Sequence, residues 1–311
     1  MAVFSVDQDF YGIDLFEEGR PGRSSAYLIR GTEPVLVDPG SARSHQALEA
    51  GLGVLGLRFE DLRHVIITHV HLDHAGGVGQ VMQRAEQAVL HCHPRAKRHM
   101  VDPSRLEAGA RAVYGEQMEQ MFGALLPVPE ERVVTHEDGD RLDAGDRALV
   151  FYDTPGHAKH HTCVVDVKTQ GIFSGDTIGI RYTPEYTGWD FVYGFPTTTP
   201  SDFDPDVMLH TLDRLEALDL ARVYHTHYGV SEAGEAFDFA RRGTRAIGAM
   251  AAGMGPDTPL AEVEEGLKEV IRQDLADVGR SITDVSPLAL DIMLNSQGIL
   301  VYLQKKALGK L

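Results

Sequence analysis

Cysteine and long apolar runs are both scarce in this sequence. Its 311 residues include two cysteines, Cys92 and Cys163, which are too few for a disulfide framework. Cys163 lies in an apolar stretch and is expected to be a small core residue. No apolar run reaches the length of a membrane span, and the first residues lack the basic and apolar segments of a secretory leader. We therefore expect a cytoplasmic protein with no membrane partner.

Basic residues are outnumbered by acidic ones. Lys and Arg total 29 and Asp and Glu total 46, which gives a formal net charge of −17 at pH 7. Proteins that bind nucleic acids draw much of their affinity from Lys and Arg contacts with phosphates, so this charge argues against a nucleic-acid partner. The hydrophobic fraction of 43% is ordinary for a globular protein, and the length allows one large domain or one domain with an appendage.

Residues 68–77 hold the densest cluster of chemically active side chains. His69, His71, Asp73 and His74 follow a predicted strand there. Imidazole nitrogens and carboxylate oxygens are ligands that borderline divalent cations prefer. His69 and His71 are two apart, so their rings point the same way in an extended chain. Asp73 and His74 follow where the chain is expected to turn into a helix, so their side chains aim toward a second ion. The pattern predicts a metal site; the alternative is a histidine-rich surface turn.

Further side chains of the same kind stand at the ends of other predicted strands. Those strands lie within residues 149–152, 171–177 and 223–229. The first leads to His157, the second to Asp176, and the third contains both His225 and His227. Because the last two are two apart, periodicity alone does not say which of them is a ligand.

Two other polar positions have more than one interpretation. Asp38 ends a predicted strand at an Asp-Pro-Gly turn, and it could also orient a metal-bound imidazole. His91 and His93 flank Cys92 at the end of another predicted strand. That arrangement is more typical of a strand terminus than of a metal site.

Over roughly residues 20 to 230 the chain resembles the metallo-β-lactamase superfamily. Five motifs occur in the family's order: Val37-Asp38-Pro39-Gly40, His69 to His74, Thr154-Pro155-Gly156-His157, Gly175-Asp176 and His227-Tyr228-Gly229. The likeness is to glyoxalase II-like and lactonase-like members, and the paired histidines His160 and His161 resemble a subgroup with the pattern TPGHxxHH. The resemblance implies an α+β fold, a four-layer αββα sandwich, here with a C-terminal helical extension.

The resemblance also implies two metal ions. It assigns His69, His71 and His157 to the first ion, Asp73, His74 and His227 to the second, and Asp176 to a bridge between them. The Tyr-Gly that follows His227 favours it over His225. The expected ions are zinc, with iron or manganese as alternatives. Asp73 and Asp176 are the carboxylates expected to take part in catalysis.

The predicted organisation is a catalytic domain over residues 1–229 and helices over 230–311. In the first part we expect a hairpin of two strands at 25–29 and 35–37 and two helices at 44–52 and 78–87. We also expect an insertion within about 95–127 that contains a helical stretch at 105–126. The insertion either covers the metal cleft or packs Met118, Met121, Phe122 and Leu125 on the core.

Helices are expected to fill the chain after Gly229. They should open near Ser231 and Pro259, and residues 288–308 should form two more, interrupted near Gly298. We expect this extension to buttress the domain or to form a contact in a homo-oligomer, because residues 299–303 are too apolar to face water.

These features favour a dinuclear metal-dependent hydrolase that acts on a small acyl compound. A hydroxide that bridges two ions is a nucleophile at neutral pH, because coordination lowers the pKa of water from near 15.7 to about 7. The nucleophile is then water, which agrees with the absence of a Gly-x-Ser-x-Gly turn or a Cys–His pair of catalytic spacing. The expected substrates are esters, lactones or thioesters.

Three other functions stay open. A mononuclear iron oxygenase like the persulfide dioxygenases of the superfamily would use His69, His71 or its neighbours, His157 and Asp176. A phosphodiesterase or nuclease is disfavoured by the net charge. A non-catalytic module, in which metals only hold the fold, is disfavoured by the full set of ligands.

Four side chains near the predicted ligands are candidates for binding substrate. They are His160, Arg181, Tyr182 and Tyr228, each close in sequence to a strand end. A cation or hydroxyl there would stabilise negative charge that develops on the substrate. Arg181 is favoured because it carries a fixed positive charge. In the structural alternatives Arg181 pairs with an acid, the tyrosines pack, and His160 is a solvated loop residue.

Overall fold

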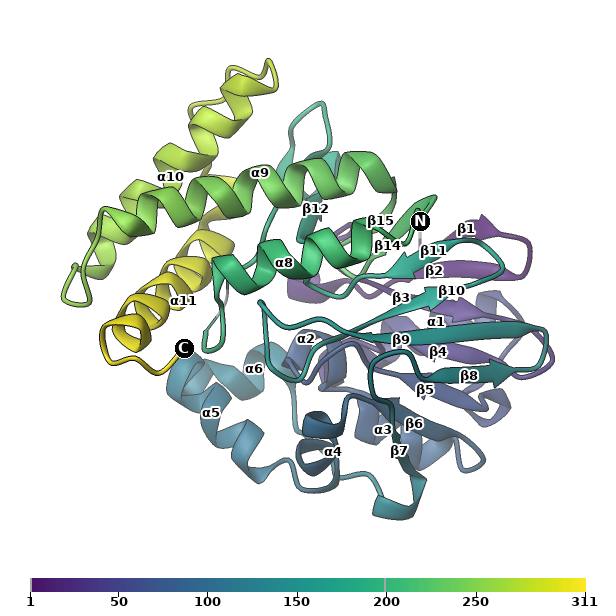
Figure 1. Ribbon diagram of the computed structural model, residues 1–311. Helices are drawn as coiled ribbons and strands as arrows, with labels where there is room; N and C mark the ends of the chain where they lie inside the picture. The colour runs from purple at the N-terminus through teal and green to yellow at the C-terminus, as the bar shows by residue number, and fades with distance from the viewer. Residues whose placement is uncertain (1, 199) are drawn as a thin grey trace.

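In the computed structural model, which describes residues 2–198 and 200–311, the chain forms two β-sheets that face each other (Figure 1). The first sheet contains, in spatial order, β1 (Val3–Asp7), β2 (Phe10–Asp14), β3 (Ser25–Ile29), β4 (Val35–Val37), β5 (His64–Ile66), β6 (Val89–Cys92) and β7 (Val133–Thr135). The second contains β15 (Gly229–Glu232), β14 (Arg222–His225), β11 (Gly171–Phe173), β10 (Thr162–Asp166), β9 (Arg147–Asp153) and β8 (Arg141–Ala144). A separate two-stranded ribbon pairs β12 (Ile180–Tyr182) with β13 (Tyr193–Phe195).

The helices cover the outer faces of both sheets and one end of the molecule. They are α1 (His45–Val54), α2 (Leu72–Ala75), α3 (Val78–Arg84), α4 (Pro94–Val101), α5 (Ser104–Tyr114), α6 (Met118–Phe122), α7 (Pro184–Thr187), α8 (Pro205–Glu216), α9 (Ala233–Ala252), α10 (Leu260–Asp277) and α11 (Ala289–Ala307). Short 3-10 turns lie at Glu17–Gly19, Ala42–Ser44, Phe59–Asp61, Gly115–Gln117, Glu130–Arg132 and Ser286–Leu288. No helix in the described ranges is both long and apolar enough to cross a bilayer.

Three apolar layers hold the sandwich together. Between the sheets, Tyr27, Phe151 and Tyr224 belong to one buried cluster. Leu48 of α1 joins a second cluster on the outside of the first sheet, and Leu212 of α8 joins a third on the outside of the second sheet. Helix, sheet, sheet and helix are thus stacked in four layers, which confirms the fold expected from the sequence.

Strand direction brings the candidate ligands to one edge of the sandwich. β4 and β5 are parallel, so the segments after them, which begin at Asp38 and Ile67, leave the first sheet side by side. β11 and β14 are also parallel, so Asp176 and His227 follow strands that end at the same edge of the second sheet. The hairpin predicted at 25–29 and 35–37 is confirmed as β3 and β4.

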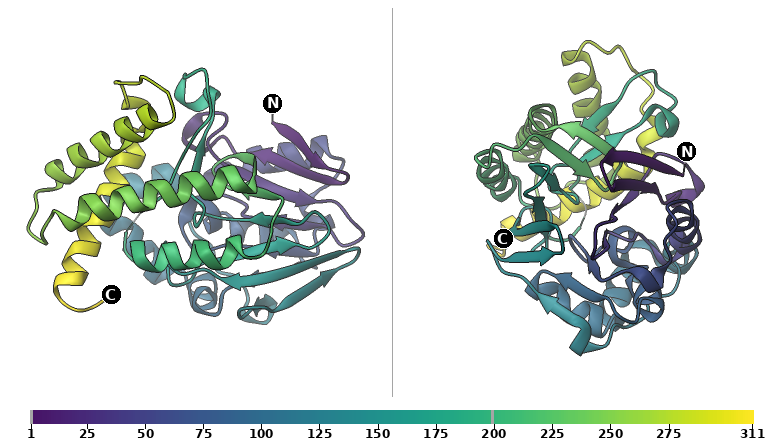
Figure 2. Two further views of the ribbon diagram at one scale, coloured as in Figure 1. Left: turned by 45° about the horizontal axis from the view of Figure 1, so that its top comes forward. Right: turned by 90° about the vertical axis from the view of Figure 1, so that its right-hand side faces the viewer.

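The helices of the C-terminal region differ from expectation in two places. β15 continues the second sheet, so the extension does not begin in helix at residue 230, and α9 starts at Ala233 and packs on α8. The break expected near Gly298 is absent, because α11 runs unbroken over Ala289–Ala307. Gly298 is buried, and packing of the surrounding turns offsets the helix penalty of about 1 kcal/mol for glycine. Figure 2 shows α10 and α11 at one end of the sandwich.

The insertion between β6 and β7 is also broken where one continuous stretch was expected. α5 ends at Tyr114, and Gly115 has a φ of +60°, a conformation that side chains with a Cβ rarely adopt. α6 then packs Met118 and Phe122 against Leu72 of α2. The insertion therefore lies directly over the short helix that carries Asp73 and His74.

Candidate metal centre

Asp38 joins the loops that carry the candidate ligands. Its buried carboxylate accepts hydrogen bonds from the Thr68 backbone N–H at 2.8 Å and from the hydroxyls of Thr68 at 2.8 Å and Thr226 at 2.7 Å. It also lies 2.9 Å from His74 Nδ1, which must donate because an ionised carboxylate only accepts. This contact orients the ring of His74 so that its other nitrogen, Nε2, faces Asp176 Oδ1 at 3.0 Å.

One group of four potential ligands lies on the side of His71. The ligating atoms of His69, His71, His157 and Asp176 are all within 4.8 Å of one another. His71 Nδ1 lies 2.9 Å from His69 Nε2 and 3.1 Å from His157 Nε2. Burial and the neighbouring His157 lower the pKa of His71 to about 4, so its ring is neutral and able to bind a metal at neutral pH.

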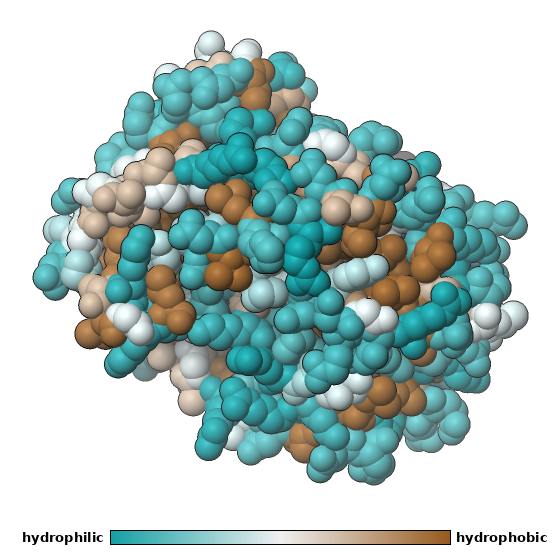
Figure 3. Space-filling model, viewed as in Figure 1, coloured by the Kyte–Doolittle hydropathy of each residue, from teal (hydrophilic) through white to brown (hydrophobic). Residues whose placement is uncertain are grey.

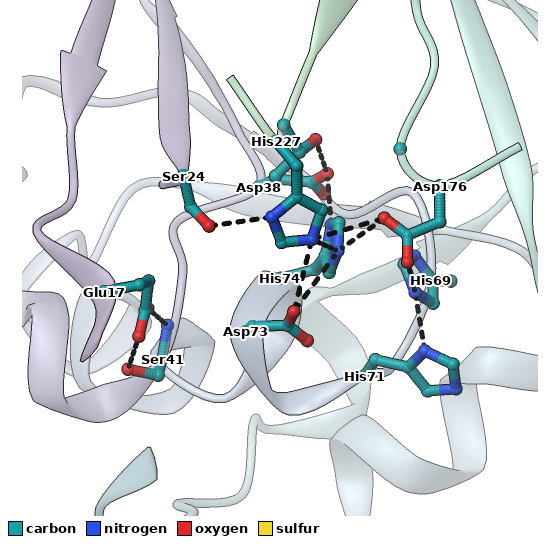
Figure 4. A network of polar contacts seen from close by, with 12 residues as sticks. Glu17, Ser24, Asp38, Ser41, His69, His71, Asp73, His74, Asp176 and His227 are labelled. Atoms are coloured by element: carbon teal, nitrogen blue, oxygen red, sulfur yellow. Dashed lines mark hydrogen bonds and ion pairs between the residues drawn. The ribbon is translucent and has the colours of Figure 1, made fainter. Parts of the chain in front are cut away.

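A second group lies beside it and consists of Asp73, His74 and His227. His227 Nε2 is 3.2 Å from His74 Nε2 and 3.3 Å from Asp73 Oδ2 (Figure 4). His227 Nδ1 lies 2.9 Å from the Ser24 hydroxyl, which orients the ring. The structure places His227 in this group and His225 outside it, with His225 Nε2 at 3.1 Å from the Ser231 hydroxyl.

Asp176 stands between the two groups with one oxygen toward each. Oδ2 lies 3.4 Å from His157 Nε2, and Oδ1 lies 3.0 Å from His74 Nε2 and 3.4 Å from His227 Nε2. Oδ1 is buried and accepts no hydrogen bond from the described residues. Although burial opposes it, the neighbouring His74 and His157 hold the pKa of Asp176 well below its usual range. A buried, ionised oxygen without a donor fits a cation between the two groups.

His161 supports this carboxylate from behind. Its Nε2 accepts a hydrogen bond from the Asp176 backbone N–H at 3.1 Å, and its Nδ1 lies 2.8 Å from the Thr154 hydroxyl. His160 instead lines the cavity above the ligands, and its Nδ1 is buried without a hydrogen-bond partner in the described part of the chain. The paired histidines of the sequence therefore have different surroundings.

A cavity of about 410 Å³ opens over the two ligand groups. Its walls include His71, Asp73, Asp176 and His227, together with residues from three other regions of the chain: Arg23 after β2, Arg98, His99, Arg105, Leu106, Gly109, Ala110, Val113 and Tyr114 of the insertion, and Asp291 and Leu294 of α11. The insertion thus lines the cavity, and its apolar side chains, among them Met118 and Phe122, pack in a small cluster with Leu72 of α2. Sequence reasoning missed the contribution of α11.

Three of the four candidate substrate-binding side chains do not line this cavity. Arg181 directs Nη1 to the Tyr228 carbonyl oxygen at 3.2 Å. Tyr182 is buried, with its ring parallel to those of Tyr186 and Tyr193, and the Tyr228 ring lies 5.3 Å from that of Phe4. Nearness in sequence to Asp176 does not bring Tyr182 into the cavity, because this residue of β12 packs in a separate apolar cluster.

His91 and His93 lie away from both ligand groups. His91 bridges two other imidazoles, with Nε2 at 3.0 Å from His64 Nδ1 and Nδ1 at 2.8 Å from His136 Nε2. Because the two contacts use opposite sides of the His91 ring, the three rings form a chain and not a convergent site. His93 caps α4 by accepting from the Arg95 N–H.

Comparison with known proteins agrees with this architecture. The sequence model of the Metallo-beta-lactamase superfamily matches residues 19–227. The metallo-beta-lactamase fold-containing protein ST1585 of Sulfurisphaera tokodaii is 24% identical over 215 residues, which are 68% of this chain and 74% of that protein. Its solved structure superposes with a TM-score of 0.66 over 93% of this chain and 97% of that chain, at 21% identity.

Two other relatives differ from each other in the activities that their names describe. The type A flavoprotein fprA of Rhodobacter capsulatus is 25% identical over 72% of this chain, which spans 49% of that protein. An acyl-coenzyme A thioesterase of Homo sapiens is 27% identical over 57% of this chain, which spans 63% of that protein. The chain thus covers less than two thirds of both of these proteins.

Proposed function

The chain belongs to the metallo-beta-lactamase superfamily, and from that membership we propose that it is a hydrolase that uses two divalent metal ions to cleave an ester, lactone or thioester bond. The observation that carries this proposal is the position of Asp176. Its two oxygens face the two groups of ligands, at 3.4 Å from His157 on one side and 3.0 Å from His74 on the other. A likeness to an acyl-coenzyme A thioesterase supports an acyl substrate.

The donor set fits this assignment of metals. His69, His71 and His157 would hold one ion, Asp73, His74 and His227 the other, and Asp176 both. Mixed imidazole and carboxylate ligands suit zinc, and also iron or manganese. Two bound divalent ions would lower the pKa of a coordinated water and polarise the substrate carbonyl.

The side chains around the ligands position them and shape the reaction space. Asp38 fixes the ring of His74, Ser24 fixes that of His227, and His161 holds the backbone of Asp176. Tyr114 of α5 lines the same cavity, where burial and the nearby carboxylate of Asp73 raise the pKa of its phenol. The phenol stays protonated at neutral pH and is able to donate a hydrogen bond to a carbonyl oxygen that gains negative charge.

The size of the cavity favours a small substrate over a polymer. A volume of about 410 Å³ lies within the range of about 300–1,000 Å³ that is common for small-molecule sites. α5 and α11 close it on two sides, so an extended nucleic-acid strand would meet helices where it needs an open groove. This supports the acyl substrate over a phosphodiester.

Metal analysis together with an assay panel tests the proposal. The purified protein should bind close to two divalent ions per chain, and it should hydrolyse at least one member of a panel of esters, lactones and thioesters. A content of one iron with none at the second group would favour the mononuclear oxygenase instead. Two ions with no hydrolysis of any acyl compound would remove the proposed reaction but keep the dinuclear centre.

A further inference from the structure

The charged groups on the cavity wall do not balance one another. Arg23 forms a buried bidentate ion pair with Asp291, at 2.9 Å and 2.6 Å, and Asp202 pairs with Lys305 at 3.1 Å. Asp73 and Asp176 belong to the ligand groups. Every acidic side chain that lines the cavity in the described ranges therefore already has a cationic partner or a place among the ligands.

Two arginines at the mouth of the cavity form no ion pair with an acidic side chain of the described residues. Arg98 of α4 and Arg105 of α5 are exposed and lie in the lining, and neither is within 4 Å of a carboxylate of the described residues. By contrast, Arg111 on the same helix as Arg105 pairs with Glu107 at 2.8 Å. In a chain with a net charge of −17, two arginines at the cavity without a carboxylate within 4 Å are a local concentration of positive charge, near which the exposed Asp102 interacts with Arg105.

His99 completes this cationic rim as an acceptor. Arg98 Nε donates to His99 Nε2 at 3.2 Å, so the imidazole is neutral and its other nitrogen carries the proton. Burial and the two neighbouring guanidinium groups lower the pKa of His99, in agreement with this neutral form. The contact holds Arg98 at the rim without neutralising its charge.

An apolar surface continues from the rim toward the ligands. Leu106, Ala110 and Val113 recur at helical spacing on the side of α5 that lines the cavity, and Leu294 of α11 also lines it. No residue of α5 is fully buried, and Val113 keeps 37% of its surface exposed. This inner side of α5 is therefore available to an apolar group.

We infer that Arg98, His99 and Arg105 form an anion-binding subsite, which holds a phosphate or carboxylate on the leaving group of the substrate while its acyl chain lies against α5. The inference rests on the proposed function for the reaction itself. Water adds to the acyl carbon, the bond to the leaving oxygen or sulfur breaks, the leaving group takes up a proton, and the acid is released as its carboxylate. Guanidinium groups suit this role because they bind both kinds of oxyanion in a bidentate manner.

Kinetics with one acyl chain on three thiols test this subsite. The hexanoyl thioesters of coenzyme A, glutathione and N-acetylcysteamine present phosphates, carboxylates and no negative charge respectively. Replacement of both arginines, R98Q/R105Q, should raise KM for at least one charged thioester by roughly 10-fold or more and leave KM for the neutral one within about 2-fold. The charged thioester that is affected identifies the anion. The matched control is R111Q, on the outer surface of α5, which should change none of the three values.

A binding measurement separates this inference from the proposed reaction. Calorimetric titration of the protein as purified, with its metal content measured, with S-hexyl-coenzyme A and S-hexylglutathione, which resist hydrolysis, should show weaker binding of at least one of them by R98Q/R105Q and not by R111Q. Equal binding of both compounds by the double variant and the wild type would overturn the subsite. Loss of binding in the double variant, without hydrolysis of any ester, lactone or thioester by the wild type, would support the subsite and overturn the proposed reaction.

Discussion

Asp176 is the residue on which a two-metal centre most depends. If its carboxylate bridges two ions, Asp176→Ala should weaken both sites together, and the metal content after dialysis should fall from about two per chain toward zero. Elemental analysis measures this directly. Asp202→Ala is the matched control, since Asp202 lines the same cavity but pairs with Lys305, and it should keep both ions. Loss of a single ion from the Asp176 variant would make this residue a terminal ligand of one site.

Tyr114 tests whether the cavity wall takes part in the reaction. Tyr114→Phe removes the phenol and keeps the ring, which packs on Phe122 at 4.9 Å. We expect kcat to fall by roughly 10-fold with little change in KM, which corresponds to about 1.4 kcal/mol of transition-state stabilisation. Arg181→Ala should leave kcat/KM unchanged, because its side chain points to the Tyr228 carbonyl and away from the cavity. A normal kcat in the Tyr114 variant would show that the hydroxyl plays no part.

At the scale of elements, three imidazoles connect neighbouring strands of the first sheet. Burial, together with His136 and His64, lowers the pKa of His91 to about 3. The unfolded chain, with a pKa near 6.5, then binds more protons than the folded one below that pH, so this group's contribution to stability is present above pH 6.5 and is lost as pH falls toward 3.

Replacement of His91 should therefore make the free energy of unfolding depend less steeply on pH below pH 6.5. Urea unfolding of metal-free wild type and His91→Leu between pH 6 and 4 should give slopes that differ by up to about 1.4 kcal/mol per pH unit, with the smaller slope in the variant. His210→Leu is a control for the loss of a histidine that lies outside the chain of rings. Parallel curves for wild type and the His91 variant would mean that His91 is protonated at no cost in the folded protein.

Sequence patterns predicted the positions of the candidate ligands better than they predicted which residues line the cavity above them. Each candidate ligand follows a short apolar strand within a few residues, so local pattern and strand direction sufficed to bring His69, His157 and Asp176 together. The same reasoning did not place Arg181 and Tyr182, because Tyr182 packs in a separate apolar cluster and Arg181 directs its guanidinium to the Tyr228 carbonyl. Gly298 shows the limit of helix rules, since tertiary packing overrides the local preference.

At the scale of the whole molecule, one ion pair ties α11 to the loop between β2 and β3 at the cavity over the candidate ligands. Arg23 is 6% exposed and Asp291 is 5% exposed. Their ion pair joins the loop between β2 and β3 to α11. Nothing in the sequence indicates this pair, because 268 positions separate its members and neither lies in a motif.

Removal of Asp291 should destabilise the protein strongly. Asp291→Ala leaves the buried guanidinium with Glu18 as its remaining partner, and we expect a loss of about 3–5 kcal/mol in the free energy of unfolding, measured with urea. Asp257→Ala, an exposed change near the start of α10, should cost less than about 0.5 kcal/mol. The double variant R23M/D291L should recover most of the loss, since it removes both charges together. A stability equal to wild type in Asp291→Ala would mean that water reaches Arg23.

The contribution of α11 to the cavity also bears on the order in which the protein matures. During synthesis His227, the last of the candidate ligands, leaves the ribosome well before Asp291 and Leu294 do. A nascent chain therefore possesses its complete set of ligands while one side of the cavity is still unmade. Metal ions could then enter by a wide opening that the finished protein no longer has, and exchange of bound metal should be slower after release than loading is during translation.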